Sequence, residues 1–147
     1  MSGVERGART PDASGTGAAP RTVGGAARTA AVWGAAFVGL GVALGAFGAH
    51  TLSGLVAEAR LETFETAVRY QVYQGLGLLA LAAIAPTGRL AARSGPLLIA
   101  GTLVFSGALY ALVAGAPSWF GAVAPVGGVL LIAGWAVAVF QLARKGA

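Results

Sequence analysis

The uncharged stretch at residues 30–49 limits most strongly what this chain can fold into. It runs for about 20 residues, which lets it cross a hydrocarbon core of about 30 Å as an α-helix. Lipid offers no partners to backbone N–H and C=O groups, so such a segment has to pair them within itself. Three apolar runs of similar length follow, at residues 66–85, 96–114 and 122–142. The sequence therefore predicts an all-α membrane protein with four transmembrane helices.

The composition agrees with this class. Hydrophobic residues make up 56% of the chain and charged residues 10%, whereas about 25% of a typical soluble domain is charged. Short connections between the runs predict an antiparallel bundle over residues 28–147. Residues 1–27 are rich in Gly, Ala and Arg, and they predict a disordered tail. A transit peptide is the alternative for that tail.

The segment between the first two runs, residues 51–65, is too polar to cross a membrane. Its apolar residues recur at helical spacing, with Glu58, Arg60 and Glu62 between them. This pattern predicts a short amphipathic helix at the membrane interface. An N-terminal extension of the second span is the other interpretation.

Basic residues in the connections predict the orientation of the bundle. One side holds most of them, and the other side holds Arg60, with Arg69 at its edge. We expect both termini in the cytoplasm of a bacterial cell, with the protein in its inner membrane. The net charge of +5 does not predict nucleic-acid binding, because the arginines are scattered among the connections. The basic residues on the cytoplasmic side are Arg6, Arg9, Arg21, Arg28, Arg89, Arg93, Arg144 and Lys145.

Polar residues near the first connection form the candidate functional cluster. Glu65 and Arg69 are four residues apart, the spacing of a helical ion pair. That pair is interpreted as fixing the start of the second helix, with gating or ion attraction as the alternative. His50 is interpreted as a cap or hydrogen-bonding partner, with proton or metal chemistry as its alternative. The amides are expected to bond across helices. The cluster comprises His50, Glu62, Glu65, Arg69, Gln71 and Gln74.

Small residues mark candidate helix contacts. Gly41 and Gly45 form a G-x-x-x-G pair, which lets another backbone approach closely. We interpret it as packing within the bundle, with a dimer seam as the alternative. Thr102, Ser106 and Tyr110 share a helical face, which predicts packing or backbone hydrogen bonds, with a hydroxyl pathway as the alternative. The candidate packing residues are Gly41, Gly45, Gly48, Ser106, Gly107, Gly127 and Gly128.

The chain contains no motif of a known catalytic class. It has neither G-x-S-x-G nor H-E-x-x-H, and no phosphate-binding loop with lysine. It also has no cysteine, so thiolate metal sites and thiol nucleophiles are excluded. Ser53 and Ser106 have no general base at a recognisable spacing. We therefore expect no enzymatic activity, no cofactor and no metal.

Four blocks occur in order along the chain: GAFGAH (45–50), ETAVRYQVYQ (65–74), GTLVFSGALY (101–110) and APVGG (124–128), followed by Gly134-Trp135. Together they resemble the domain of unknown function 423, which includes bacterial inner-membrane proteins and the eukaryotic transmembrane protein 256-like group. The resemblance covers residues 30–142 and implies a four-span membrane protein without an established activity. Members of that family often have His where this chain has Gln74. The resemblance therefore does not imply a two-histidine site with His50.

Together these features predict a structural or accessory membrane component that acts through protein or lipid contacts. The alternative is a transport or permeation protein for protons or a small solute. Four helices of this length fill their own interior with side chains, so transport would require an oligomer or a narrow proton path. The expected partners are the lipid bilayer and either a second copy of the chain or another membrane protein.

Overall fold

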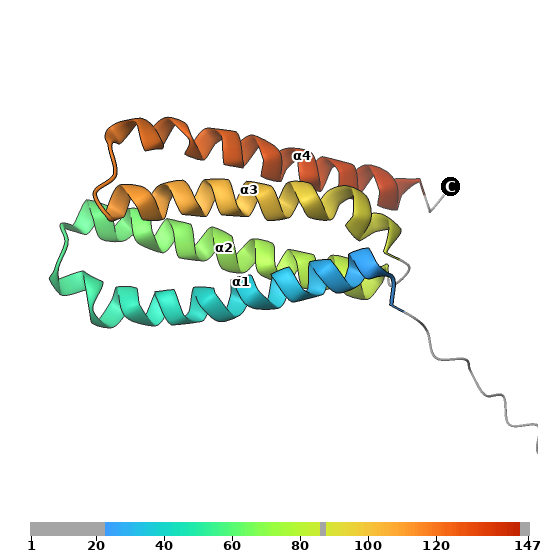
Figure 1. Cartoon of the computed structure of the whole chain (residues 1–147), viewed down its shortest axis with the longest axis horizontal. Helices are drawn as coiled ribbons and strands as arrows, with labels where there is room; N and C mark the ends of the chain where they lie inside the picture. The colour runs from blue at the N-terminus through green and yellow to red at the C-terminus, as the bar shows by residue number, and fades with distance from the viewer. Residues whose placement is uncertain (1–22, 86–87, 145–147) are drawn as a thin grey trace, which may run out of the picture.

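The computed structural model describes residues 23–85 and 88–144, and its long elements are all helices (Figure 1). Short 3-10 helices lie in the two connections at one end of the molecule. The elements in chain order are α1 (Gly25–His50), η1 (Leu52–Gly54), α2 (Glu58–Ile84), α3 (Arg89–Val113), η2 (Ser118–Ala122) and α4 (Ala124–Ala143).

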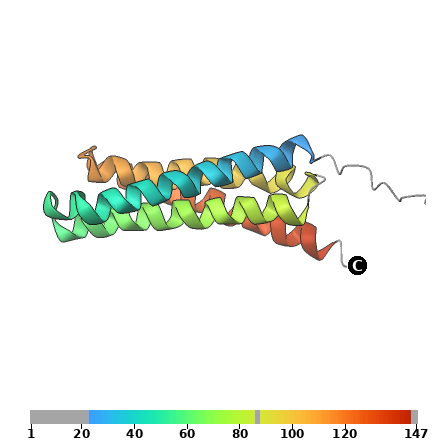
Figure 2. The ribbon, with the colours of Figure 1, turned by 90° about the horizontal axis from the view of Figure 1, so that it is seen from below.

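The four long helices lie side by side in Figure 1. The α1–α2 and α3–α4 connections are at one end, and the start of α1, the start of α3 and the end of α4 are at the other. The packing follows the chain: α1 packs on α2, α2 on α3 and α3 on α4. In addition α1 contacts α3, and Figure 2 shows the start of α1 beside the start of α3. We call the end that holds the start of α1 the terminal end and the other the connection end.

Within residues 23–85 and 88–144, three segments are long and apolar enough to cross a membrane: Gly25–Gly54, Arg89–Val113 and Ser118–Ala143. They contain the predicted spans 30–49 and 122–142 and all but the last residue of the span 96–114. The remaining predicted span, 66–85, is the second in chain order and falls almost entirely within α2. This helix is not among the three apolar segments. The first half of the predicted span carries Arg69, Gln71 and Gln74, and these side chains lower the mean hydropathy of the helix.

Large apolar side chains cover the outside of the bundle. In water such a surface would be an aggregation or binding patch, whereas lipid chains solvate it without penalty. The most exposed include Val32, Leu40, Val42, Leu76, Ile84, Leu103, Val126, Val129, Ile132, Val139 and Phe140. The core contains several alanines and only a few large residues. These are Phe37, Leu78, Leu81, Leu90, Leu98 and Leu131.

Three boundaries differ from the sequence-based prediction. The first helix begins at Gly25, inside the predicted tail, because Ala26, Ala27 and Ala30 favour a helix and pack inward. Residues 1–22 of that tail lie outside the described part. Residues 58–65 form the first turns of α2 rather than a separate interfacial helix, so the alternative interpretation describes them. The 3-10 helix η1 and the turn after it complete this connection.

The third helix begins at Arg89 and not near Pro96, which lies inside it. Proline disfavours a helical conformation in the preceding residue by a clash with its Cβ. That residue is Gly95, which has no Cβ, so the helix can continue through the proline. Pro125 does occupy one of the first two positions of α4, where a missing N–H has no consequence.

Close helix contacts depend on glycine. A Cβ on Gly34 would lie 2.7 Å from the Gly75 carbonyl oxygen, and a Cβ on Gly75 would lie 2.9 Å from that of Gly34. The backbones of α1 and α2 therefore touch at this point. Between α3 and α4, Gly101 makes room for Leu131 and Gly134 makes room for Leu98.

Candidate functional site

Gln71 lies at the centre of a buried polar network between the helices. It is 4% exposed, and its Nε2 donates a hydrogen bond to the Phe37 carbonyl of α1 at 3.0 Å. Its Oε1 accepts a hydrogen bond from the Tyr110 hydroxyl of α3 at 3.0 Å. One side chain of α2 thus connects three helices.

Two further hydrogen bonds join α2 to its neighbours, one from α4 and one from α3. Gln74, also on α2, accepts a hydrogen bond on its Oε1 from the indole Nε1 of Trp135 at 2.8 Å. The Ser106 hydroxyl of α3 donates to the Ala67 carbonyl of α2 at 2.9 Å. We call Ala67, Gln71, Gln74, Ser106, Tyr110 and Trp135 the polar network.

The polar network is closed. The buried polar residues of the described chain are Gln71, Gln74, Ser94, Thr102 and Ser106, and none is charged. Ser94 and Thr102 donate to carbonyls of their own helix, at 2.8 and 2.6 Å. Across the described ranges every fully buried side-chain nitrogen or oxygen has a hydrogen-bond partner.

Four members of the predicted cluster lie elsewhere. His50, Glu62, Glu65 and Arg69 are all exposed, at the last residue of α1 and along the first half of α2. Glu65 and Arg69 line a shallow pocket of about 260 Å³ between α1 and α2, with Gly45, Gly48, Phe64 and Val68. The structure therefore divides the six predicted residues into an exposed rim and two buried amides. The ion pair between Glu65 and Arg69 stays a prediction.

The candidate packing glycines differ in how closely they contact a neighbouring helix. Gly41 and Gly48 receive Val72 and Phe64 of α2 closely, and Gly127 faces the Phe105 backbone. Gly45 and Gly128 make ordinary contacts with Val68 and Phe105, at 3.7 and 4.0 Å from an added Cβ. An added Cβ on Gly107 would have nothing within 4 Å, because this residue faces outward on α3. Gly107 therefore does not make the close helix contact that was predicted for it within the bundle.

Sequence reasoning missed the partners of the two amides. Trp135 lies in the middle of a span, away from the interfaces where tryptophan is usually found. A mid-span indole needs an acceptor for its N–H, and Gln71 and Gln74 are the amides of another span. That signal could have predicted a pairing between α2 and α4. It could not have chosen between the two amides.

The described residues show no group of three or more His, Cys, Asp or Glu that could hold a metal ion. His50 is the last residue of α1, and the glutamates of the rim are exposed on α2. This leaves the polar network and the exposed rim as the two candidate sites of the chain. Neither is a recognisable catalytic arrangement.

Comparison with known proteins agrees with the geometry. Residues 44–128 match the profile of a protein family of unknown function, DUF423. A UPF0382 membrane protein of Staphylococcus haemolyticus is 40% identical over 103 residues, which cover 69% of this chain and 84% of that protein. The UPF0382 inner membrane protein YgdD of Escherichia coli is 40% identical over 111 residues, covering 71% and 84%.

The UPF0382 membrane protein YwdK of Bacillus subtilis is also 40% identical, over 104 residues that cover 68% of this chain and 84% of that protein. No solved structure matches the chain. The matched segment contains most of the polar network, from Ala67 to Tyr110, and the whole exposed rim. This chain belongs to the DUF423 family, the UPF0382 membrane proteins, whose function is unknown.

Proposed function

We propose that this protein is a non-enzymatic accessory component of the bacterial inner membrane that acts through contacts with a partner protein or with lipid. The observation that carries the proposal is the closed polar network. Its buried members are amides and hydroxyls that pair with one another, with Trp135 or with backbone carbonyls. Groups of this kind hold helices together in a bilayer.

The same observation argues against the transport alternative for a single copy. A proton path needs groups that gain and lose protons, and an aqueous pore needs unpaired polar groups along it. The buried polar residues of the described chain are uncharged. The charged residues Glu65 and Arg69 face a pocket on the outside of the bundle. The candidate nucleophiles Ser53 and Ser106 both donate to backbone carbonyls, which supports the absence of an enzymatic role.

The proposal includes a topology. We propose that all four helices cross the membrane as an antiparallel bundle, with α2 as the fourth span and both termini in the cytoplasm. Arg28, Arg89, Arg93 and Arg144 lie at the terminal end, and Glu58, Glu62 and Glu65 lie at the connection end beside Arg60 and Arg69. Positive charge near span ends favours the cytoplasmic side. Burial of Gln71 and Gln74 removes these two amides of α2 from lipid. The relative YgdD is named an inner membrane protein.

A flux assay tests the proposal. The purified protein is reconstituted into liposomes that contain a pH-sensitive dye, and a proton gradient and a membrane potential are imposed in turn. We expect the same leak as in protein-free liposomes, and gramicidin serves as the positive control. Proton flux above that leak, lost in a folded Glu65→Gln/Arg69→Gln variant, would overturn the accessory role.

A crosslinking assay tests the contact itself. A photoreactive amino acid replaces Tyr73, which is 57% exposed on α2, in cells that carry the native membrane. We expect a discrete crosslinked product, to a second copy or to another membrane protein, or to lipid. The matched control replaces Leu78, which is fully buried on the same helix, and should give no intermolecular product. Equal products from both positions would argue against a defined contact surface.

A further inference from the structure

A pocket lies at the terminal end, between the start of α3 and the end of α4, and it belongs to neither candidate site. Its volume is about 630 Å³, within the range of roughly 300–1,000 Å³ in which small molecules bind. Three of its lining residues are arginines, and none is acidic. The residues that line it are Arg89, Leu90, Ala92, Arg93, Phe140, Gln141, Leu142 and Arg144.

The arginines leave a local excess of positive charge. The acidic residues of the described chain, Glu58, Glu62 and Glu65, all lie in the first turns of α2 at the connection end. The terminal end therefore has no described carboxylate to balance Arg93 and Arg144. Arginine guanidinium groups bind phosphate with paired N–H donors and a delocalised charge. A ligand that complements this pocket carries negative charge.

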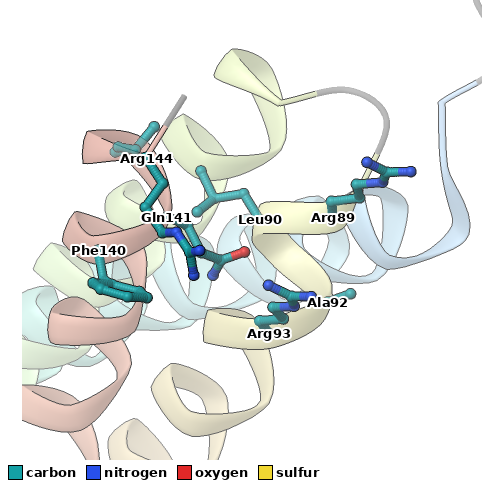
Figure 3. A pocket seen from close by; sticks show the side chains of 8 residues that line it. Arg89, Leu90, Ala92, Arg93, Phe140, Gln141 and Arg144 are labelled. Carbon is teal, nitrogen blue, oxygen red and sulfur yellow. The ribbon is translucent and has the colours of Figure 1, made fainter. Parts of the chain in front are cut away.

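The side chains are arranged around one space. Figure 3 shows Arg93, Gln141 and Arg144 between the start of α3 and the end of α4, whereas the Arg89 side chain extends away from α4. The Arg144 guanidinium carbon lies 5.1 Å from the centre of the Phe140 ring, a cation–π distance. This contact holds one guanidinium at the edge of the apolar surface.

The start of α3 and Gln141 of α4 add two favourable features. It has no side-chain cap and no acidic residue in its first turn, so its first N–H groups and its dipole favour an anion close to Arg89 and Leu90. The Gln141 Nε2 donates to the Val137 carbonyl at 3.3 Å, which leaves its Oε1 as an acceptor. A ligand with a hydroxyl beside its phosphate can use that acceptor.

The surroundings of the pocket favour the phosphate of a lipid headgroup over a free phosphate ion. Phe140 and Leu142 line it and are 61% and 44% exposed, which places outward-facing apolar side chains beside the arginines. A free anion gains nothing from such a surface, whereas acyl chains pack against it. Basic pockets between membrane helices on the cytoplasmic side are typical sites for anionic headgroups.

We propose that the pocket formed by Arg93, Gln141, Arg144 and the start of α3 binds the headgroup of an anionic phospholipid whose phosphate carries a hydroxyl-bearing group, as in phosphatidylglycerol. The phosphate lies between the guanidinium groups of Arg93 and Arg144, and a headgroup hydroxyl donates to Gln141. The acyl chains follow Phe140 and Leu142 along α4. This inference rests on the proposed insertion into the membrane with the terminal end at the cytoplasmic surface, and it names the lipid for one of the two kinds of contact proposed above.

The test uses the full chain in detergent, titrated with phosphatidylglycerol and with phosphatidylcholine, and bound lipid is counted by native mass spectrometry. We expect one phosphatidylglycerol to remain bound where phosphatidylcholine does not. The variant Arg93→Gln/Arg144→Gln should weaken that binding by tenfold or more, since each basic residue near the surface contributes on the order of a fivefold change. Gln141→Leu should reduce the preference for phosphatidylglycerol over phosphatidic acid.

Arg28→Gln is the matched control, because Arg28 is an exposed arginine of the terminal end that does not line the pocket. It should bind phosphatidylglycerol as the unaltered chain does. Equal losses in the control and the double variant would overturn the site, as would equal binding of the two lipids by the unaltered chain. Displacement by inorganic phosphate or glycerol phosphate at the same concentrations would assign the pocket to a free anion and would also overturn it.

Folding of each variant is checked by circular dichroism without added lipid, and Arg93→Lys/Arg144→Lys retains the charge if the glutamine variant does not fold. That lysine variant should bind phosphatidylglycerol more weakly than the unaltered chain, because lysine lacks the paired N–H donors of arginine, and equal binding by the two would contradict the proposal. A failed lipid titration leaves the flux and crosslinking results unaffected, so the two proposals fail separately.

Discussion

The Trp135 indole of α4 reaches across to α2 and donates a hydrogen bond to Gln74 at 2.8 Å. Its ring lies over Gly77, where an added Cβ would come within 2.5 Å of Cζ2 and 2.8 Å of Cη2. The glycine therefore provides the space, and the amide provides the acceptor, for one large side chain. Through this side chain α4 contacts a helix other than α3, on which it packs along its length.

A methyl group at Gly77 should displace the indole. Gly77→Ala is expected to destabilise the protein by about 1–3 kcal/mol, the usual cost of overpacking a filled site. The indole can rotate away only by giving up its hydrogen bond to Gln74. The free energy of unfolding is measured by titration with sodium dodecyl sulfate in mixed micelles, followed by circular dichroism.

Trp135→Phe gives the control for this prediction, since phenylalanine lacks the atoms that meet the added methyl group. In that background Gly77→Ala should cost less than about 0.5 kcal/mol, as expected for a pair that interacts directly. The same cost in both backgrounds would mean that the glycine is needed for another reason.

Removing the central amide should cost more than its own hydrogen bonds suggest. Gln71→Leu leaves the Tyr110 hydroxyl without its acceptor, and we expect a loss of about 1–2 kcal/mol. Tyr110→Phe should cost about 0.5–1 kcal/mol, and it should reduce the effect of Gln71→Leu because no donor is then left unpaired. A double-mutant cycle in mixed micelles measures this coupling. Strictly additive losses would contradict the hydrogen bond.

Much of the fold could be predicted from hydropathy, because apolar runs of membrane-spanning length leave few alternatives to helices. The continuation of α2 from Glu58 through the polar segment was less predictable. Glu58, Arg60 and Glu62 fit an interfacial helix and a helix extension equally well by pattern alone. Pro96 was misleading for a physical reason, since the glycine before it has no Cβ to clash with the proline ring, which removes one of the costs that usually end a helix.

The candidate site was predicted only as a set of residue types. The sequence groups His50, Glu65 and Gln71 by proximity, whereas helix rotation turns the first two outward and the amide inward. The partners of the amides lie 39 and 61 residues further along the chain, on helices whose relative rotation is not encoded in local spacing. The pocket at the terminal end likewise combines residues of α3 and α4. From the sequence, its arginines predicted only the orientation of the bundle.

The contact between Gly34 and Gly75 should tolerate no side chain. Gly75→Ala would bring a Cβ to 2.9 Å from the Gly34 carbonyl oxygen and from Val38 Cγ2, and to 3.0 Å from the Phe37 Cβ. Because a backbone carbonyl cannot rotate away, helix α1 has to shift, and we expect a loss of about 2–3 kcal/mol. Unfolding in mixed micelles measures it.

Gly39→Ala is the matched control on α1, where an added Cβ would have nothing within 4 Å. It should leave stability unchanged or raise it by up to about 1 kcal/mol, because alanine favours a helix over glycine. A comparable loss at both positions would show that the glycines act through backbone flexibility and not through the α1–α2 contact.

The proposed orientation can be measured with single cysteines, because the chain has none of its own. Ser53→Cys places a thiol in the exposed 3-10 helix at the connection end, and Ala143→Cys places one at the end of α4. In intact bacterial cells with a permeabilised outer layer, a membrane-impermeant maleimide should label the first and not the second. After cell lysis it should label both.

The four arginines at the terminal end make this arrangement the favoured one, since moving them across the bilayer opposes the bias that retains basic residues in the cytoplasm. Labelling of Ala143→Cys alone in intact cells would reverse the orientation and, with it, would place the terminal pocket at the outer surface. Labelling of both positions would mean that α2 or another helix does not cross the membrane, and the fourth span would then be lost while the packing of the polar network remained.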